Sequence, residues 1–297
     1  MKFTVEEFRD WKNKNVTLLG MSGVGKSYLS SMLQGKNWFH YSGDYRIGTR
    51  YLDEHILDMI KQQAMQVPFL KDLLRKDWIH IRNNITVDDL GPVLSFVGKL
   101  GNPVLGGVEL DEFIRRQAIY RQAEIDAMLE VPEFIKKAQD IYGYPHFIND
   151  VGGSLCELDE PGVIESLVDC SLILYIQVTN QAQEDTLVQR AQSSPKPLFY
   201  RAEFLQQHLQ MYFAEMGLEY AAQIDPDDFA RWVFPHLFHS RIPRYEAIAQ
   251  PHGYTVTSDE VAQVKDEDDF LALIELAIAR RNEVGEHEDS NNQARKS

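Results

Sequence analysis

The residues with the clearest chemistry form a glycine-rich run near the start of the chain. Residues 20–27 read Gly-Met-Ser-Gly-Val-Gly-Lys-Ser, which fits the pattern G-x-x-x-x-G-K-[ST]. Glycines let successive backbone N–H groups curl around phosphate oxygens, and the N-terminus of a following helix adds positive potential. This spacing lets Lys26 reach the β- and γ-phosphates and lets the Ser27 hydroxyl ligate Mg²⁺. The run therefore predicts a phosphate-binding loop.

The expected nucleotide is ATP. Guanine-binding proteins carry an element of the type Asn-Lys-x-Asp after a later strand, whereas residues 178–182 read Val-Thr-Asn-Gln-Ala, without that Lys or Asp. GTP is therefore the weaker choice. The loop residues expected to contact the nucleotide are Gly20, Ser22, Gly23, Val24, Gly25, Lys26, Ser27 and Tyr28.

An aspartate, Asp150, lies at the end of a later predicted strand. Residues 149–153 read Asn-Asp-Val-Gly-Gly. An aspartate at the carboxyl end of a strand beside the phosphate loop, here Asp150, is placed to hold a Mg²⁺-bound water. Gly153 then brings a backbone N–H toward the γ-phosphate. The alternative is that Asp150 only caps the next turn.

The elements around these residues alternate between strand and helix. Short apolar runs predict strands at 16–19, 38–42, 146–149, 171–178 and 254–256. Helical patterns fill the intervals at 27–33, from 161, at 181–192, from 225 and at 268–281. This alternation predicts an α/β fold with a parallel sheet flanked by helices. Between residues 51 and 109 the strand signal disappears, which predicts a helical insertion ahead of a long helix at 110–129.

We expect a single domain over 1–285, with the helical insertion inside it. Residues 286–297 are polar, lack an apolar face and are expected to be disordered.

Composition excludes several classes of function. The chain has 297 residues and a net charge of −15, which repels nucleic-acid backbones and anionic lipid. Its apolar runs are too short to span a bilayer, and its N-terminus lacks the apolar segment of a secretory signal. The two cysteines, Cys156 and Cys170, do not form a disulfide framework. We expect a cytoplasmic protein without nucleic-acid or membrane partners.

Several short pieces, taken in order, resemble shikimate kinase and related small-molecule kinases. Those enzymes carry Asp-x-Asp after the second strand, and residues 42–44 read Ser-Gly-Asp. The resemblance implies that Asp44 holds the acceptor hydroxyl, while Ser42 replaces the first aspartate. Residues 120–124, Tyr-Arg-Gln-Ala-Glu, resemble the Phe-Arg-x-x-Glu element and make Arg121 a candidate for binding a substrate anion. Gly152 and Gly153 resemble a glycine run that is one residue longer in the family, which implies that Gly152 contacts the substrate.

The second half of the chain continues the resemblance. The family has an arginine on a helix beside the adenine and an Arg-Pro-Leu lid, and these imply the same roles for Arg190 and Lys196. Arg241, before the family's last helix and strand, would grip the substrate. The resemblance covers roughly 15–50 and 110–280, and it implies the three-layer fold of P-loop NTPases.

Physical reasoning supports these assignments and also leaves alternatives. A carboxylate near the γ-phosphate orients an acceptor hydroxyl, and lid cations stabilise transition-state charge. Asp44 would serve equally to cap a turn, Arg121 to form a surface ion pair, and Lys196 to remain exposed without a role. His236 and His239 lie three residues apart, but they lack a third ligand with suitable spacing, so packing on a helix face is expected.

The sequence therefore predicts an ATP-dependent kinase acting on a hydroxyl of a small anionic metabolite, with ATP and Mg²⁺ as cofactors. The first rival is a nucleotide-dependent ATPase or switch that acts through a protein partner, with the insertion as its docking surface. A kinase of nucleic-acid ends is a second rival, which the net charge of −15 disfavours. A phosphate loop kept only for structure is the third.

Overall fold

The computed structural model describes residues 3–294, and the chain divides into two compact units. The first consists of the described parts of Met1–Tyr41, Met128–Leu187 and Phe238–Ser297. The second consists of Ser42–Ala127 and Val188–Leu237. The predicted insertion at 51–109 lies inside the second unit, which also takes in residues on both sides of it.

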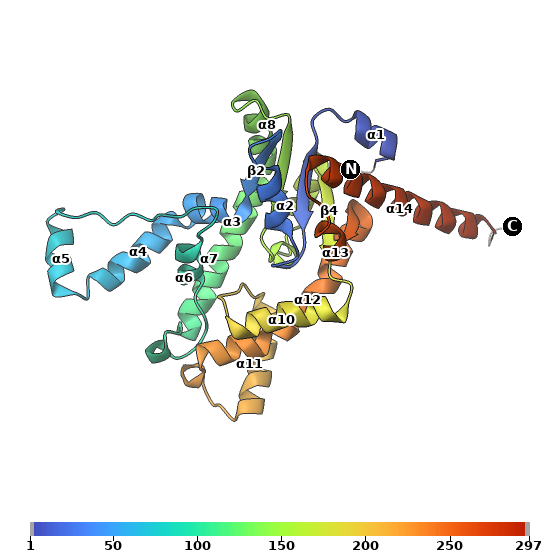
Figure 1. Ribbon diagram of the computed structural model, residues 1–297. Coiled ribbons are helices and arrows are strands. Elements are labelled where there is room, and N and C mark those ends of the chain that lie inside the picture. Colours follow the sequence, from blue (N-terminus) through green and yellow to red (C-terminus); the bar gives the residue numbers. More distant parts are fainter. Residues whose placement is uncertain (1–2, 295–297) are drawn as a thin grey trace. The chain divides into compact units, whose positions relative to one another are not determined.

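The first unit contains a five-stranded parallel sheet, which confirms the predicted α/β fold (Figure 1). Its strand order is β2-β3-β1-β4-β5. The central strand pairs with both neighbours, and Val16 lies opposite Ile148 on one side and Leu172 on the other. Every residue of this strand is buried, as in sheets covered on both faces. The strands are β1 (Asn15–Leu19), β2 (Trp38–Ser42), β3 (His146–Asp150), β4 (Leu172–Gln177) and β5 (Gly253–Thr257).

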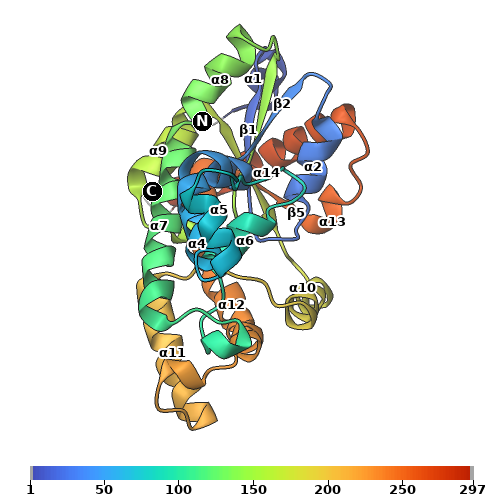
Figure 2. The same ribbon diagram turned by 90° about the vertical axis from the view of Figure 1, so that its left-hand side faces the viewer.

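Helices cover both faces of the sheet. Figure 2 shows α8 and α9 on one side of the strands and α2, α13 and α14 on the other. These helices are α2 (Lys26–Leu33), α8 (Val131–Asp140), α9 (Pro161–Cys170), α13 (Ser258–Val261) and α14 (Glu267–Ala294). The sheet and its two helical coverings make the three predicted layers. The unit also holds α1 (Val5–Asp10), the 3-10 turn η3 (Leu155–Glu157) and the second part of α12 (Pro226–His252).

The strand order creates a crevice at the carboxyl ends of β1 and β3. The chain leaves β1 toward β2 on one side of the sheet and leaves β3 toward β4 on the other. Because such crossovers are right-handed, the helices that follow β1 and β3 lie on opposite faces. Ligands bind in α/β sheets at this kind of switch point. The predicted phosphate loop follows β1, and Asp150 is the last residue of β3.

Buried polar side chains link β1, β3 and the start of β4. The Thr17 hydroxyl lies 2.7 Å from the Ser171 hydroxyl, and Asn149 donates to Thr17 Oγ1 at 3.2 Å. All three residues are fully buried. In a low-dielectric interior such bonds penalise a slip in strand register, because a slipped strand leaves the groups unpaired. The network therefore keeps the ends of β1 and β3 in register.

The second unit is helical and has its own core. It holds α3 (Gly43–Arg46), the π-helical turn η1 (Ile47–Tyr51), α4 (Asp53–Ala64), α5 (Pro68–Arg75), α6 (Gly91–Val97), η2 (Pro103–Leu105), most of α7 (Leu110–Leu129), the end of α10 (Gln181–Ser193), α11 (Ala202–Met216), η4 (Ala221–Gln223) and the start of α12. The α11 helix packs its buried face on α7 and α12. The largest core side chains are Phe113, Tyr200, Phe204, Tyr212 and Phe229.

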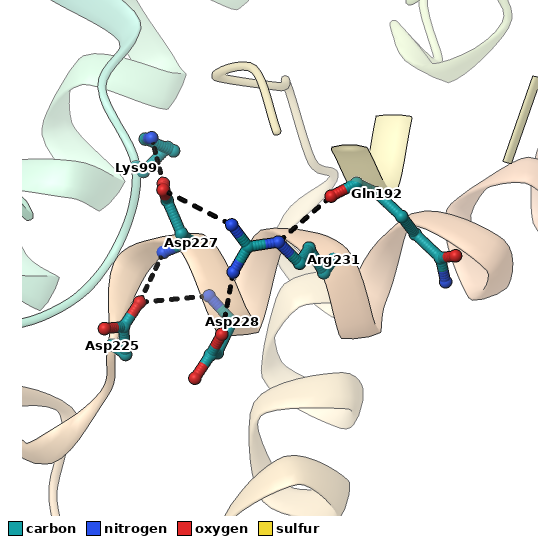
Figure 3. A network of polar contacts seen from close by, with 6 residues as sticks. All are labelled: Lys99, Gln192, Asp225, Asp227, Asp228 and Arg231. Atoms are coloured by element: carbon teal, nitrogen blue, oxygen red, sulfur yellow. Dashed lines mark hydrogen bonds and ion pairs between the residues drawn. The ribbon is translucent and has the colours of Figure 1, made fainter. Parts of the chain in front are cut away.

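A polar network holds the first turn of α12 (Figure 3). Asp225 caps the helix by accepting the backbone N–H groups of Asp227 and Asp228 at 2.9 and 3.1 Å. Arg231 pairs with Asp228 at 2.8 Å and donates to the carbonyl of Gln192 at 3.0 Å. Lys99 pairs with Asp227. The partly exposed ion pairs add little stability. The hydrogen bond from Arg231 to Gln192 joins α12 to the end of α10, just before the segment that carries Lys196.

Near the C-terminus, α14 continues through residues 286–294, part of the segment for which the sequence predicts disorder. The remainder of that segment, 295–297, lies outside the described residues. Within the described part of the chain, no helix combines the length and apolar character needed to cross a bilayer.

We predict that His146 makes the protein less stable in mild acid. The Lys14 backbone N–H donates to His146 Nδ1 at 3.1 Å, which requires that nitrogen to be unprotonated. Burial, aided by the Lys14 ammonium, lowers the pKa of His146. The unfolded chain therefore takes up the proton first, so the free energy of unfolding falls as the pH drops below about 6.5. Urea unfolding from about pH 7 to about pH 5 measures this decline.

His146→Asn keeps a hydrogen-bond acceptor but does not titrate, so it should flatten the decline. His80→Asn, at an exposed position of the second unit, is the control and should leave the slope unchanged. Equal slopes in all three proteins would contradict the prediction.

Candidate functional site

The phosphate loop joins β1 to α2, as the sequence predicts. The strand ends at Leu19 and the helix begins at Lys26. Gly23 and Gly25 have φ angles of +90° and +108°, in the left-handed region that favours glycine. A side chain at Gly25 would also meet Val261, because an added Cβ would lie 2.7 Å from Val261 Cγ1. The glycines at these positions therefore allow the tight path of the loop.

The Lys26 side chain folds back over this loop. Its ammonium donates to the carbonyls of Gly20 and Met21 at 2.8 and 2.9 Å, and the residue is only 7% exposed. A buried ammonium is stable only when it is well paired. The loop thus holds a positive charge beside its own backbone N–H groups, which suits phosphate oxygens. Two residues after Lys26, the Tyr28 hydroxyl donates to the carbonyl of Val264 at 2.8 Å.

The hydroxyl of Ser27 meets the carboxylate of Asp150. Ser27 Oγ donates to Asp150 Oδ2 at 2.8 Å, and Asp150 is 9% exposed. Asp150 is the last residue of β3, and Ser27 lies in the first turn of α2, which follows the neighbouring parallel strand β1. This arrangement explains why residues 123 positions apart meet. A hydroxyl and a carboxylate are the hard oxygen donors that Mg²⁺ prefers when substrate phosphates complete its shell. The donor set fits the predicted metal, and its role in holding one remains a prediction.

The segment after β3 lies against the phosphate loop. A Cβ added to Gly153 would lie 3.3 Å from the backbone nitrogen of Ser22 and 3.8 Å from the Arg241 guanidinium. Gly153 therefore lies directly beside the backbone of the phosphate loop. The neighbouring Gly152 is buried.

We predict that Gly153→Ala weakens nucleotide binding without unfolding the protein. The new methyl group would press on the Ser22 nitrogen, which lies in the phosphate cradle, and the loop must shift by a few tenths of an ångström. We expect about a 10-fold rise in the dissociation constant for ATP, the equivalent of about 1.4 kcal/mol. Isothermal titration calorimetry measures it. Gly162→Ala, with open space around the added atom, is the control.

The second part of α12 supports the same segment. Arg241 donates from Nε and Nη2 to Glu157 Oε2 at 2.9 and 2.5 Å, and both residues are buried. Burial alone would lower the pKa of Arg241, but the Glu157 carboxylate raises it above its ordinary value. One turn on, the Tyr245 hydroxyl donates to the Gly153 carbonyl at 2.6 Å. Burial raises the pKa of Tyr245 well above its ordinary value, which keeps that hydroxyl protonated as a donor.

Four other predicted site residues belong to the second unit. Asp44 lies half-buried in the short helix α3, whose N-cap is Ser42, with its hydroxyl accepting the Tyr45 N–H at 3.3 Å. Arg121 lies partly buried on α7, whereas Arg190 and Lys196 are exposed. The structure thus places the phosphate loop, Asp150, Gly152, Gly153 and Arg241 in the first unit and these four in the second. Their roles stay predictions.

Sequence reasoning missed Gln117, which fastens the segment after Lys196. Its side-chain amide donates to the Leu198 carbonyl at 3.3 Å and accepts the Tyr200 N–H at 2.9 Å. Gln117 is buried and lies one helical turn before Arg121 on α7. The only available signal was a polar residue on the apolar stripe of a predicted helix.

The secondary candidates do not form a metal site. Among the described residues, no group of three or more His, Cys, Asp or Glu side chains is arranged to hold a metal ion. His239 contacts Glu184 at 2.7 Å, and His236 packs beside Trp232 with ring centroids 4.6 Å apart. Neither cysteine forms a disulfide bond, and Cys156 is buried. Burial raises the pKa of the Cys170 thiol to about 11.

No protein-family model matches the chain, and no curated protein matches it. Among solved structures, a shikimate kinase from Bacteroides thetaiotaomicron is similar over 92% of this chain and 98% of that chain. The sequences are 16% identical, and the TM-score is 0.39. A similarity of this size does not assign a function to the chain, so function rests on the residues around the phosphate loop.

Proposed function

We propose that this chain is an ATP-dependent kinase that transfers the γ-phosphate of ATP to a hydroxyl of a small anionic metabolite. The observation that carries the proposal is the joint placement of Lys26, Ser27 and Asp150 at the carboxyl ends of β1 and β3. An ammonium and a hydroxyl–carboxylate pair beside a glycine loop match the needs of a Mg²⁺-bound triphosphate. When bound, Mg²⁺ supplies charge neutralisation at the β- and γ-phosphate oxygens.

The chain's own residues supply positioning on both sides of the transfer. Loop N–H groups and Lys26 bind the phosphates, and Gly153 brings a further N–H to the γ-phosphate. On the acceptor side, the Asp44 carboxylate orients the hydroxyl and takes its proton late in the transfer. Lys196 then stabilises transition-state charge and helps to exclude water. In a chain of net charge −15, Arg121 favours an anionic acceptor.

ATP turnover by the purified chain tests this proposal. Turnover is measured with Mg²⁺ alone and with a panel of hydroxylated carboxylic and phosphorylated metabolites. We expect stimulation by one metabolite class, with Asp44→Asn abolishing the stimulation while ATP binding stays within about 2-fold of the unsubstituted protein. Hydrolysis that is indifferent to every metabolite and to Asp44→Asn would overturn the kinase assignment.

A second candidate is a nucleotide-dependent switch that acts through a protein partner, and α5 favours it. None of the eight residues of this helix, all within the described part of the chain, is buried. Exposed apolar side chains flank or occupy it, with Phe69 71% and Trp78 69% exposed. Residues 61–82 carry five Lys or Arg against two Asp, within a chain of net charge −15. The partner that this charge favours is an acidic protein surface.

Tryptic cleavage distinguishes the two candidates, because Lys71, Arg75 and Lys76 lie in or next to α5 and are exposed. A switch predicts that the cleavage rate at these sites differs between ATP and ADP without any metabolite present. A kinase predicts the same rate with either nucleotide and protection of other sites when the acceptor is added. Binding of the chain to anionic vesicles through α5 would contradict the acidic-partner assignment.

A further inference from the structure

We propose that Arg241, Glu157 and Tyr245 make the phosphate loop prefer ATP over ADP, because they hold Gly153 against Ser22. The proposal rests on the proposed nucleotide site and goes beyond it. The resemblance to shikimate kinase implies that Arg241 grips the substrate, whereas here Arg241 is a positioning residue for the segment after β3. The contacts that carry the proposal all lie within the first unit.

The first step is that α12 presents two side chains to one segment. Arg241 and Tyr245 are four residues apart, so they lie on the same face of the helix. Arg241 reaches Glu157 in η3, and Tyr245 reaches the carbonyl of Gly153 at 2.6 Å. The segment from Gly153 to Glu157 is therefore fastened to α12 at both of its ends.

The second step concerns the burial of the ion pair. Arg241 is 6% exposed and Glu157 is 1% exposed. Taking two charges out of water is costly, and apolar side chains of similar size often serve stability equally well. A buried pair still holds its two elements together as a clamp, because two guanidinium N–H groups, Nε and Nη2, both donate to Glu157 Oε2, and removing either partner would leave a buried charge unpaired. The pair therefore fixes the position of the segment more tightly than apolar packing does.

The third step links this clamp to the γ-phosphate. The Gly153 carbonyl is held by Tyr245, and its Cα faces the Ser22 nitrogen of the phosphate loop. These two contacts hold Gly153 in place from both sides, and we infer that they limit where its N–H can lie. In the proposed site the loop backbone binds the α- and β-phosphates, so the Gly153 N–H is left for the γ-phosphate, which only a triphosphate has. Loosening the clamp should therefore weaken ATP binding and leave ADP binding nearly unchanged.

Dissociation constants for a non-hydrolysable ATP analogue and for ADP, each with Mg²⁺, test the proposal by calorimetry on the full chain. Tyr245→Phe removes one hydroxyl, and we expect it to weaken binding of the ATP analogue about 10-fold and of ADP less than about 2-fold. The double variant Arg241→Met/Glu157→Met removes both charges together and should give the same pattern. Tyr175→Phe is the matched control, because Tyr175 stacks on Tyr245 with centroids 5.5 Å apart.

Three outcomes overturn the proposal. Equal weakening of both nucleotides would reduce the clamp to a structural role, and unchanged binding of both would remove it altogether. A higher KM for the acceptor with an unchanged ATP-to-ADP ratio would return Arg241 to substrate binding. If the double variant fails to fold, the two dissociation constants of Tyr245→Phe, for the ATP analogue and for ADP, decide between these outcomes. Failure of the unsubstituted chain to bind any nucleotide would instead contradict the proposed function itself, and the inference would fall with it.

Discussion

Lys26→Met is expected to abolish turnover, with a loss of about 10³-fold, near the upper end of the losses seen for one preorganised donor. The Lys26 ammonium donates to two loop carbonyls and is 7% exposed, so it sits desolvated beside the phosphate cradle. A charge held in that environment interacts with phosphate more strongly than one in water. Methionine keeps the length of the side chain and removes the charge. A coupled assay of ADP release measures the loss.

Lys36→Met is the matched control, because Lys36 is exposed in the same unit and follows α2. It removes the same charge from the chain at a distance from the loop, and turnover should stay within about 2-fold. Thermal unfolding of both variants separates lost binding from lost folding. If Lys26→Met binds ATP as tightly as the unsubstituted protein, the loop is not a phosphate site, and a purely structural role for the glycine run would stand.

Asp150→Asn is expected to raise the Mg²⁺ concentration needed for half-maximal turnover by about 10- to 100-fold, the usual cost of losing a group that orients metal ligands. The Asp150 carboxylate accepts the Ser27 hydroxyl at 2.8 Å. Asparagine retains an oxygen that accepts this bond, but it lacks the charge that attracts the cation and its bound water. Titrating Mg²⁺ at saturating ATP measures the shift.

Asp159→Asn is the comparison for this variant. Asp159 lies further along the same segment, where its exposed carboxylate pairs with Arg244 at 2.7 Å. The Asp159→Asn substitution should leave the Mg²⁺ concentration needed for half-maximal turnover unchanged. If Asp150 only caps the turn after β3, Asp150→Asn will also leave that requirement unchanged and will lower thermal stability alone.

Local sequence pattern was sufficient for the sheet and for the loop. Each strand was predicted within two residues of its observed ends, because each is a short apolar run bounded by glycine or polar residues. The phosphate loop was equally clear, since the pattern G-x-x-x-x-G-K-[ST] between a predicted strand and a predicted helix leaves few other interpretations. The helices α8 and α11 were missed. The α8 helix begins at a Val-Pro step that resembles a loop signal but places proline in the first turn of a helix.

The pairing of distant residues rested on an assumption about strand order. Sequence reasoning took the strand that ends at Asp150 to lie beside the phosphate loop, and the order β2-β3-β1-β4-β5 makes β3 the neighbour of β1 and brings Asp150 to Ser27. The clamp between Arg241 and Glu157 is a stronger case. The sequence around either residue does not indicate that the other is its partner. The two residues are 84 positions apart, and they meet only because η3 and α12 pack together in the fold.

The sequence by itself therefore determined the conformation of the loop near the start of the chain, because backbone conformation and the helix N-terminus are local properties of the glycine run. The tertiary structure decided which side chains surround that loop and which are committed elsewhere. Arg241 shows the difference. Its position in the sequence is compatible with a substrate-binding arginine, whereas packing places it in the interior against Glu157. Burial and charge pairing depend on the whole fold, since they are set by residues that meet only when the sheet has formed.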